Sequence, residues 1–411
     1  MDVVIERCAG LDVHKKTVTA CVRTPSRGGG ERGRRVRTFT TTNPGLEGLR
    51  EWLVSCGVTH VAMESTGVYW RPVWAVLEGD FDLLLVNARH VKHVPGRKTD
   101  VKDSEWIAQL LECGLLKGSF VPPPAIRDLR DLTRLRKSLI RDRSRQVNRV
   151  AKVLELANIK PGSVVSDIMG KTGRAVLDAM IEGEEDPWVL AGLARGTLRC
   201  KRDKLAEVIS GLIRDHHRFL LQRHLRLIDE LSGQIEELDD RIEGVTRPLN
   251  AALLLLESVP GVGRRSAEAI LAEIGDDMSK FPTPGDFASW ARVCPGNHES
   301  AGKRKSARTG KGNAWLRDAL SQVAWAAARV RGSYYRGLYF RHKARGGPKR
   351  AIVVVQHALL VAIWHMLSRG TLHEDLGQDH FRAHDRDRTK RHLLQRLRKI
   401  GVEVKVIESA A

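Results

Sequence analysis

Four carboxylates in this chain have types and spacing that suit a metal centre: Asp12, Glu64, Asp100 and Asp103. Asp12 lies within one short apolar run that predicts a buried strand, and Glu64 ends another. Asp100 and Asp103 are three residues apart at the start of a predicted helix, so they share one side of it. Carboxylates that converge repel one another unless a cation neutralises them. Their hard oxygen ligands favour Mg²⁺ or Mn²⁺.

A purely structural interpretation of the same residues has to be kept beside this one. The chain contains 49 Asp and Glu residues, so such a pattern also arises by chance. Asp100 suits a helix N-cap, with Asp103 in the first turn. In favour of the metal site, an unpaired carboxylate is costly in apolar strands such as those of Asp12 and Glu64. Spacing alone leaves both interpretations open.

The overall charge indicates a nucleic-acid partner. The 411 residues include 69 Lys and Arg, and the formal net charge is +20. An anionic membrane surface is the competing partner, but we expect no membrane span, since no apolar run reaches about 18 residues. The first residues do not resemble a signal peptide. Six scattered cysteines without C-x-x-C pairs favour reduced thiols over structural zinc. We therefore expect a cytoplasmic protein that associates with the nucleoid of a bacterium.

The first section, residues 1–120, alternates strand and helix patterns. It predicts an α/β domain in which helices pack on a mixed sheet. The expected strands are 8–14, 17–23, 35–41, 58–64 and 82–87, and the expected helices are 44–55, 69–79 and 101–114.

The second section, residues 121–245, is predicted to be helical. A basic helix at 127–148 and an irregular insert at 159–200 precede a heptad-like apolar seam from Leu221 to Ile242, which His224 interrupts. This pattern predicts a coiled-coil-like helical hairpin arm, and pairing of the seam between protomers is the alternative. A mainly α-helical domain at 246–370 and a basic tail at 371–411 complete the expected organisation.

The third section contains two candidate phosphate-binding features. The turn at 258–263 joins two apolar helices and resembles a helix-hairpin-helix element, in which the backbone N–H groups around Gly261 and Gly263 would bind phosphate. The most basic segment follows, and Asp318 is the only acid between Ser300 and Arg350. A segment whose charged residues are almost all positive favours contact with phosphates over a surface that only faces solvent. Its candidate residues are Lys303, Arg304, Lys305, Arg308, Lys311 and Arg317.

Aromatic residues are interleaved with the arginines that follow this segment. They are Tyr334, Tyr335, Tyr339 and Phe340. Such rings stack on nucleic-acid bases, but a role in the core is an equal alternative.

Several motifs give the chain a specific resemblance. They are Gly-Leu-Asp-Val-His-Lys at 10–15, Met-Glu-Ser-Thr-Gly-Val-Tyr-Trp at 63–70, Lys-Thr-Asp-Val-Lys-Asp at 98–103, Val-Pro-Gly-Val-Gly at 259–263, Phe-Ala-Ser-Trp-Ala at 287–291, Glu-Ser-Ala-Gly-Lys-Arg at 299–304, and Lys-Gly-Asn at 311–313 followed by Leu316 and Arg317. With these motifs the chain closely resembles the DEDD-type transposases of the insertion-sequence family numbered one hundred and ten. The resemblance spans residues 8–155 and 245–370.

The resemblance implies an N-terminal RNase H-like domain of the Holliday-junction-resolvase kind, in which the metal tetrad matches Asp12, Glu64, Asp100 and Asp103. It also implies a C-terminal transposase domain whose nucleophile matches Ser300. Members of this family cut and rejoin double-stranded DNA under the guidance of a noncoding bridge RNA. A homo-oligomer, a dimer or a tetramer, with active sites shared between protomers is therefore expected.

The residues themselves do not single out Ser300. Without the resemblance it would be a loop spacer, and Ser306 and Thr309 would compete equally. A serine hydroxyl is a weak nucleophile that needs activation, which a metal held by the tetrad would supply, and Lys303 and Arg304 would offset charge on the phosphorus transition state. Two alternatives remain: a metal-dependent nuclease in which water attacks, and a nonenzymatic architectural protein that binds nucleic acid.

Overall fold

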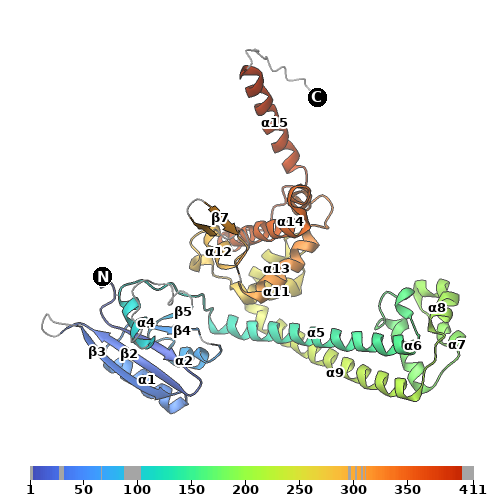
Figure 1. Ribbon diagram of the computed structural model, residues 1–411, viewed down its shortest axis with the longest axis horizontal. Coiled ribbons are helices and arrows are strands. Elements are labelled where there is room, and N and C mark those ends of the chain that lie inside the picture. The colour runs from blue at the N-terminus through green and yellow to red at the C-terminus, as the bar shows by residue number, and fades with distance from the viewer. Residues whose placement is uncertain are drawn as a thin grey trace. The chain divides into compact units, whose positions relative to one another are not determined.

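A computed structural model gives the arrangement of the chain in two compact units, Met1–Val121 and Pro122–Ala411 (Figure 1). It describes residues 3–26, 32–65, 67–87, 103–294, 298–300, 303–306, 309–310 and 312–399. Within these ranges it describes only the backbone of 298–300, 303–306, 382–390 and 392.

The first unit contains a mixed five-stranded sheet with the strand order β3-β2-β1-β4-β5. The strands are β1 (Cys8–Val13), β2 (Thr17–Thr24), β3 (Gly33–Thr40), β4 (His60–Glu64) and β5 (Asp82–Val86). The first three form an antiparallel meander, while β4 pairs parallel with β1 and β5 pairs parallel with β4. This arrangement is the expected mixed sheet and is compatible with an RNase H-like domain.

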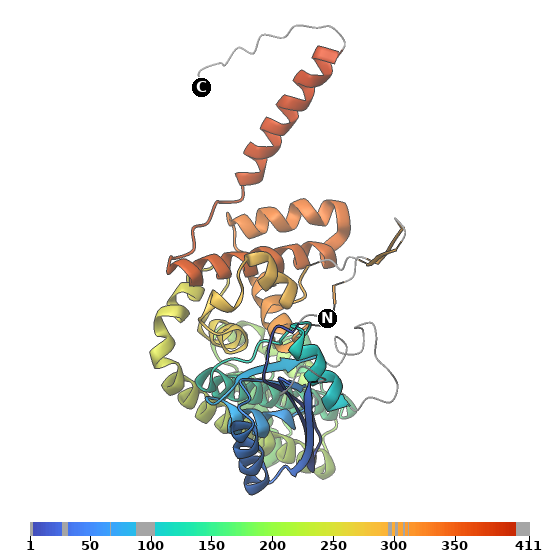
Figure 2. The same cartoon turned by 90° about the vertical axis from the view of Figure 1, so that its left-hand side faces the viewer.

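Helices cover the sheet on its two faces, because the side chains of β1 alternate between them. Leu11 and Val13 belong to a core that includes Leu49 of α1 (Asn43–Ser55) and Val73 of α2 (Trp70–Leu77). Cys8 belongs to a second core with apolar residues of α4 (Asp103–Glu112). Figures 1 and 2 show α4 against the sheet. The strands and helices expected in this section are confirmed, with ends that shift by one or two residues.

The second unit begins with a long helical hairpin, as the sequence predicted. Helix α5 (Pro124–Leu156) pairs with α9 (Asp215–Thr246) in antiparallel orientation. Arg143 Nε donates to Ser232 Oγ at 2.8 Å, and His224 Nδ1 lies 3.1 Å from Gln146 Oε1. The apolar seam of α9 therefore packs within its own chain, and pairing between protomers stays a prediction.

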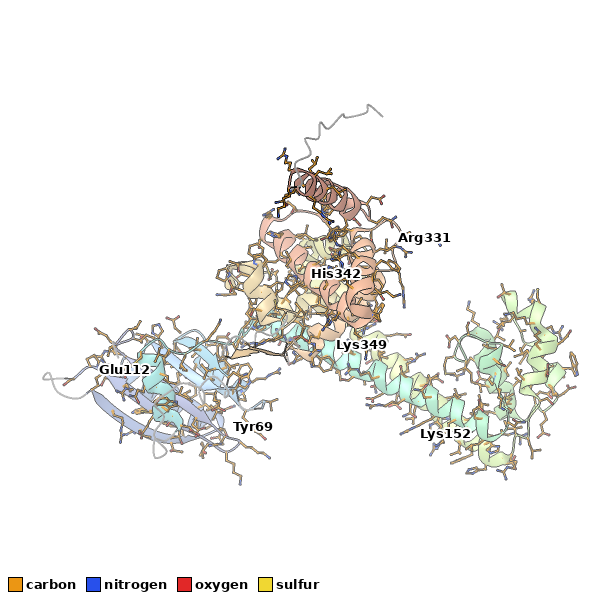
Figure 3. All side chains as sticks on the ribbon, turned by 45° about the horizontal axis from the view of Figure 1, so that its top comes forward. Tyr69, Glu112, Lys152, Arg331, His342 and Lys349 are labelled. Carbon is orange, nitrogen blue, oxygen red and sulfur yellow. The ribbon has the colours of Figure 1, made fainter. Side chains whose placement is uncertain are left out.

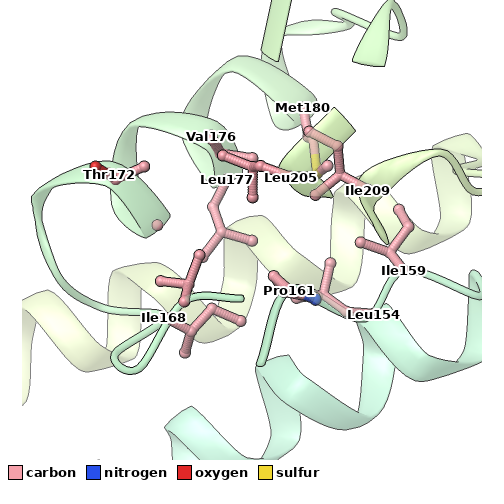
Figure 4. A pocket seen from close by; sticks show the side chains of 12 residues that line it. Leu154, Ile159, Pro161, Ile168, Thr172, Val176, Leu177, Met180, Leu205 and Ile209 are labelled. Carbon is pink, nitrogen blue, oxygen red and sulfur yellow. The ribbon is translucent and has the colours of Figure 1, made fainter. Parts of the chain in front are cut away.

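The segment expected as an irregular insert is instead a compact helical cap at the far end of the hairpin. It contains η1 (Pro161–Ser163), α6 (Lys171–Glu182), α7 (Pro187–Gly192), η2 (Gly196–Lys201) and α8 (Arg202–Ile209). Their apolar residues form one core with Leu154 of α5 and Leu221 of α9. Figure 4 shows a small apolar pocket between these helices, lined by Val176, Leu205 and their neighbours. The helical structure of this segment was not predicted from the sequence, because the helices are short and glycines separate them.

The remaining body of the second unit is mainly helical. Its elements are η3 (Arg247–Leu249), α10 (Asn250–Glu257), α11 (Arg264–Ile274), η4 (Met278–Lys280), α12 (Pro284–Trp290), β6 (His298–Ser300), β7 (Lys303–Ser306), α13 (Ala314–Ala327), α14 (Tyr334–Arg369) and α15 (His380–Lys399). Helix α14 bends at Gly347, whose φ of 77° and ψ of 171° interrupt the helical backbone before Pro348.

The expectation that no apolar run is long enough for a membrane span is wrong for α14. Within the described part of the chain, this helix is the one that is long and apolar enough to cross a membrane. Val355, Leu359 and Ile363 are nevertheless buried inside the unit. Trp364 Nε1 also donates a hydrogen bond of 2.9 Å to the carbonyl oxygen of Phe281. Packing in a protein core therefore accounts for its apolar composition.

Candidate active site

Two of the four predicted carboxylates lie side by side on neighbouring parallel strands. Leu11 of β1 pairs with Met63 of β4, so Asp12 and Glu64 occupy the next position on each strand. In the same register Gly10 pairs with Ala62. Because alternate residues share a face, Asp12 lies on the face of Gly10 and Glu64 on the face of Ala62. Ala62 belongs to the core that α4 completes, so both carboxylates are on the face that α4 covers.

Helix α4 brings a third carboxylate to the same edge. It packs directly on Gly10, where an added Cβ would lie 2.3 Å from the carbonyl oxygen of Ser104. The other end of the helix is fixed at Glu112, whose carbonyl oxygen accepts a hydrogen bond of 2.9 Å from the N–H of Val4. The helix therefore runs antiparallel to β1, and its first residue, Asp103, lies at the Asp12 end of the strand.

The donor set at this edge consists of carboxylate oxygens, which suits a hard divalent cation. Asp12 and Glu64 are half-buried, and Asp103 is exposed. In the described ranges no group of three or more His, Cys, Asp or Glu side chains is close enough to hold a metal ion. Asp100, the fourth member of the predicted tetrad, lies outside the described residues. The structure thus brings three of the four residues to one edge, without placing them in a closed coordination shell.

A histidine of the same edge was not predicted as a site residue. His14 follows Asp12 by two residues, and its Nε2 atom lies 3.2 Å from Oδ2 of Asp12. The imidazole is largely exposed, with 63% of its side chain accessible. Asp12 therefore already has one cationic partner when His14 is protonated.

The other acids of α4 have structural roles, which separates them from Asp103. Glu112, labelled in Figure 3, is buried and pairs with both Arg23 and Arg32. Glu105 pairs with Arg34 at 2.9 Å. These partners are distant in the sequence, so no local pattern pointed to them. The pairs attach α4 to β2 and β3 and hold its N-terminus at the carboxylate edge.

The predicted nucleophile lies on a β-hairpin of the second unit, which Figure 2 shows extending away from the helices of that unit. Ser300 is the last residue of β6, and its backbone pairs with Lys303, the first residue of β7. Arg304 and Lys305 are also on β7. Side chains of this hairpin, as well as Arg308 and Lys311, lie outside the described residues. The backbone thus places Ser300 opposite Lys303, with three predicted phosphate contacts on the paired strand.

The two ends of the hairpin loop meet at Arg292. This residue has a positive φ of 57°, which is uncommon for a side chain with a Cβ. A Cβ added at Gly312 would lie 2.7 Å from the carbonyl oxygen of Ala291, and one at Gly310 would lie 3.2 Å from Cδ of Arg292. The chain thus enters and leaves the loop at one place. A stacked cluster of Phe281, Phe287 and Trp290 precedes the loop.

The two glycines of the candidate helix-hairpin-helix turn differ in their surroundings. Gly261 has a φ of 87°, and an added Cβ would lie 2.5 Å from the backbone nitrogen of Ala327, so this glycine allows close packing on α13. Gly263 is exposed at the N-terminus of α11, with no heavy atom within 4 Å of such a Cβ. Both glycines are exposed, so phosphate contact through either one stays a prediction. Arg317, on the first turns of α13, is exposed.

The aromatic residues of α14 divide between core and surface. Tyr335 and Tyr339 are buried, which favours the core alternative for both. Tyr334 packs against Phe381 of α15, with ring centroids 4.9 Å apart. Phe340 is 48% exposed and lies between cations, with the Arg336 guanidinium 5.1 Å and the Lys343 ammonium 5.6 Å from its ring centroid. Phe340 is thus the residue of this group that is free to stack on a base.

Comparison with known proteins matches both units to transposases. Residues 9–159 match the family model of the DEDD transposase domain of IS110 elements, described as a transposase, and residues 253–339 match the model described as "Transposase IS116/IS110/IS902 family". The first match contains the four predicted carboxylates, and the second contains Ser300 and both turn glycines.

Two relatives align with most of the chain. A protein of Pseudomonas aeruginosa named "Probable family 20 transposase" is 26% identical over 76% of this chain and 84% of its own length. The transposase for insertion sequence element IS1111A of Coxiella burnetii is 26% identical over 69% of this chain and 71% of its own length. The chain therefore belongs to the IS110 family of insertion-sequence transposases, and it is a transposase enzyme.

Proposed function

We propose that this transposase cuts and rejoins double-stranded DNA with two sets of residues. The first is the acidic tetrad of Asp12, Glu64, Asp100 and Asp103, and the second is Ser300. The observation that carries the proposal is the convergence of Asp12, Glu64 and Asp103 at one edge of the first unit, although they come from two strands and a helix. A DEDD domain requires a divalent metal, and we propose Mg²⁺ or Mn²⁺ as the ion.

The chemistry assigns a separate task to each set. A divalent cation held by Asp12, Glu64, Asp100 and Asp103 would polarise a phosphoryl oxygen and favour the deprotonated serine hydroxyl. Ser300 Oγ then forms a bond to the scissile phosphorus, the bond from phosphorus to a deoxyribose oxygen breaks, and that oxygen leaves with a proton. The product is a phosphoserine link to one DNA end. Attack by a free deoxyribose hydroxyl on this link rejoins the DNA and regenerates the serine.

Basic residues and backbone donors are proposed to hold the phosphates around this serine. Lys303, Arg304, Lys305, Arg308 and Lys311 share the loop of Ser300, and Arg317 and Gly263 belong to the same unit. We propose the turn before α11 as a helix-hairpin-helix contact to the DNA backbone, made through Gly261 and Gly263. Gly261 also permits the turn to pack on α13.

Further parts of the proposal extend the family resemblance. A noncoding guide RNA pairs with donor and target DNA, and the protein acts in the cytoplasm on nucleoid DNA. The functional divisions are 1–120 for the metal site, 121–245 for the arm, 246–370 for the serine domain and 371–411 for a basic tail. The arm is also proposed to mediate a homo-oligomer, since Leu231, Ile235 and Leu238 stay only half-buried against α5.

A complementation experiment tests the two-part site. Asp12→Asn and Ser300→Ala should each abolish cleavage while DNA binding is kept, because the binding cations are elsewhere. If sites are shared between protomers, mixing the two variants should restore part of the activity. Gly48→Ala, in α1 where no heavy atom lies within 4 Å of an added Cβ, is a control that should cleave normally. Full cleavage by Asp12→Asn would remove the carboxylates from the mechanism.

The main alternative is a resolvase-like nuclease in which water, rather than Ser300, attacks the phosphate. The same carboxylate edge would serve that reaction, so the first unit does not distinguish the two. The distinguishing result is cleavage by Ser300→Ala without a protein-linked DNA product.

A further inference from the structure

A buried acid of the second unit connects α11, α5 and the residue that precedes α13. Glu273, in the last turn of α11, is 1% exposed. Nε and Nη2 of Arg134, on α5, donate to its two carboxylate oxygens at 2.8 Å each. The side-chain amide of Asn313, which precedes α13, donates to Oε2 at 2.6 Å. Glu273 thus joins the arm helix to the residue that ends the serine loop.

The local position of Glu273 is unfavourable for an acid, so a specific reason for it is needed. A carboxylate near a helix C-terminus faces the negative end of the helix dipole. The nearby core is apolar and contains Leu129, Ile242 and Ala272. Buried ion pairs are often no more stabilising than well-packed apolar side chains of similar volume. Stability of the fold alone therefore does not explain a charged side chain here.

The two polar atoms of the Asn313 side chain make different hydrogen bonds. Its Oδ1 caps α13 by accepting from the backbone N–H groups of Trp315 at 3.0 Å and Leu316 at 3.3 Å. Its Nδ2 binds Glu273. Since Gly312 lies against Ala291 and Arg292 at the loop entry, fixing Asn313 also fixes the place where the two ends of the serine loop meet.

Helix α5 of the arm also contacts the first turns of α13. The guanidinium of Arg134 also lies 5.7 Å from the ring centroid of Trp315. Lys137 and Arg141 pair with Asp318, the latter at 3.1 Å. These α5 residues follow a helical spacing of three and four, so one face of the arm holds the first turns of α13.

We propose that Glu273 is a positioning residue for Ser300, acting with Arg134 and Asn313 as a clamp on the base of the serine loop. This inference rests on the proposed function of Ser300. The clamp fixes the loop base relative to α5 and α11, so the hairpin presents the hydroxyl from a constant direction. Its loss should slow formation of the protein–DNA bond with little effect on DNA binding. A misplacement of about 1 Å at a reacting group lowers rates by about a hundredfold.

A swap of the two polar side chains tests the clamp. Glu273→Gln leaves Asn313 an acceptor but removes the carboxylate that pairs with Arg134 and, at 3.3 Å, with Arg130. Asn313→Asp keeps a good cap for α13 but sets two carboxylates against each other. In the double variant the new amide donates to the new carboxylate, so the bond returns with its direction reversed and the charge conserved. The readout is the single-turnover rate of covalent joining on prebound DNA, beside DNA affinity and melting temperature.

The expected result is slow joining by each single variant at a temperature where it is folded, with near-normal DNA affinity, and recovery of most of the rate in the double variant. Each single variant should also melt at a lower temperature, because it unbalances a buried charged cluster. Asp229→Asn is the matched control, because it breaks an ion pair between α9 and Arg174 of α6 and involves neither α11 nor the loop. It should join DNA at the normal rate. If a single variant does not fold, the joining rate of the double variant alone tests the clamp. Slow joining by a folded double variant overturns the clamp.

Ser300→Ala separates failure of the clamp from failure of the proposed nucleophile. If Ser300→Ala is inactive and both single variants still join DNA at the normal rate, the clamp is wrong and the nucleophile stands. If Ser300→Ala itself produces a protein–DNA bond, the proposed function is wrong.

Discussion

Replacing Gly10 by alanine should damage the first unit through one close contact. An added Cβ would lie 2.3 Å from both the carbonyl oxygen of Ser104 and the backbone nitrogen of Ala108. Ordinary contact begins at 3.4 Å, so α4 must move away from β1 by about 1 Å. Both contacts are backbone atoms, so rotation of a side chain cannot relieve them. Overpacking of this kind costs about 1–3 kcal/mol.

The same movement should disturb the chemistry, because Asp103 is carried by α4. Hydrogen exchange of the α4 amides, followed by mass spectrometry in the full chain, measures the cost. Since 1.4 kcal/mol corresponds to a tenfold change, the penalty predicts exchange that is about 5- to 150-fold faster. DNA cleavage should fall in parallel, because the third carboxylate moves away from Asp12 and Glu64.

Gly48→Ala provides the control for this prediction. Gly48 lies in α1 of the same unit, and no heavy atom lies within 4 Å of an added Cβ. Alanine in a helix is favoured over glycine by up to about 1 kcal/mol, so this variant should be equally or more stable. Unchanged α4 exchange and normal cleavage in Gly10→Ala would refute the account of how α4 positions Asp103.

Three further predictions concern charge. Burial opposes the ionisation of Asp318, but hydrogen bonds and charge from Lys137 and Arg141 outweigh this effect and lower the pKa of its carboxyl group. The ionised Asp318 therefore stabilises the fold fully at a pH above about 3.9, the pKa of an aspartate in the unfolded chain, and this stabilisation is lost as the pH falls further. The melting difference between wild type and Asp318→Asn should accordingly be constant from neutral pH to about pH 5 and shrink below pH 4, and a constant difference throughout would contradict it. Burial lowers the pKa of His373, whose Nε2 lies 2.8 Å from the Tyr335 hydroxyl, although Asp375 opposes the shift. Stability should then decline as the pH falls below about 6.5, less so in His373→Gln; equal pH profiles of the two proteins would argue against this role. DNA and RNA affinity should fall by orders of magnitude between about 50 and 200 mM salt if 6–10 phosphates are contacted, whereas an affinity insensitive to salt would exclude phosphate contacts as its main source.

The sequence predicted the parts of the first unit that depend on local pattern. Alternation of apolar residues located the strands, and carboxylates at strand ends predicted the site edge around Asp12 and Glu64. The approach of α4 to Gly10 was not predictable, since it depends on packing between residues about a hundred positions apart. For the same reason the partners of Glu112 and Glu273 had no sequence signal: Arg134 is 139 residues from Glu273 along the chain.

In the second unit the predictions from sequence were wrong where segments were short or where polar residues interrupted an apolar run. The helices of the cap at 159–200 are brief and separated by Gly and Pro, so their shared core with Leu154 was not visible. The apolar stretch of α14 was underestimated, because its polar Gln356 and its histidines interrupt the run. Ser300 was selected by family resemblance alone, since the neighbouring Ser306 and Thr309 have the same chemistry.

Mapping the protein–DNA bond tests the central claim most directly. Wild-type protein is incubated with Mg²⁺, the proposed guide RNA and end-labelled DNA. The reaction is quenched with denaturant, and protein-linked DNA is digested to peptides for mass spectrometry. The account predicts a nucleotide attached to the peptide that contains Ser300, absent without divalent metal and absent in Ser300→Ala and Asp12→Asn. Cleaved DNA without any protein link, or a link at Ser306 or Thr309, would contradict it.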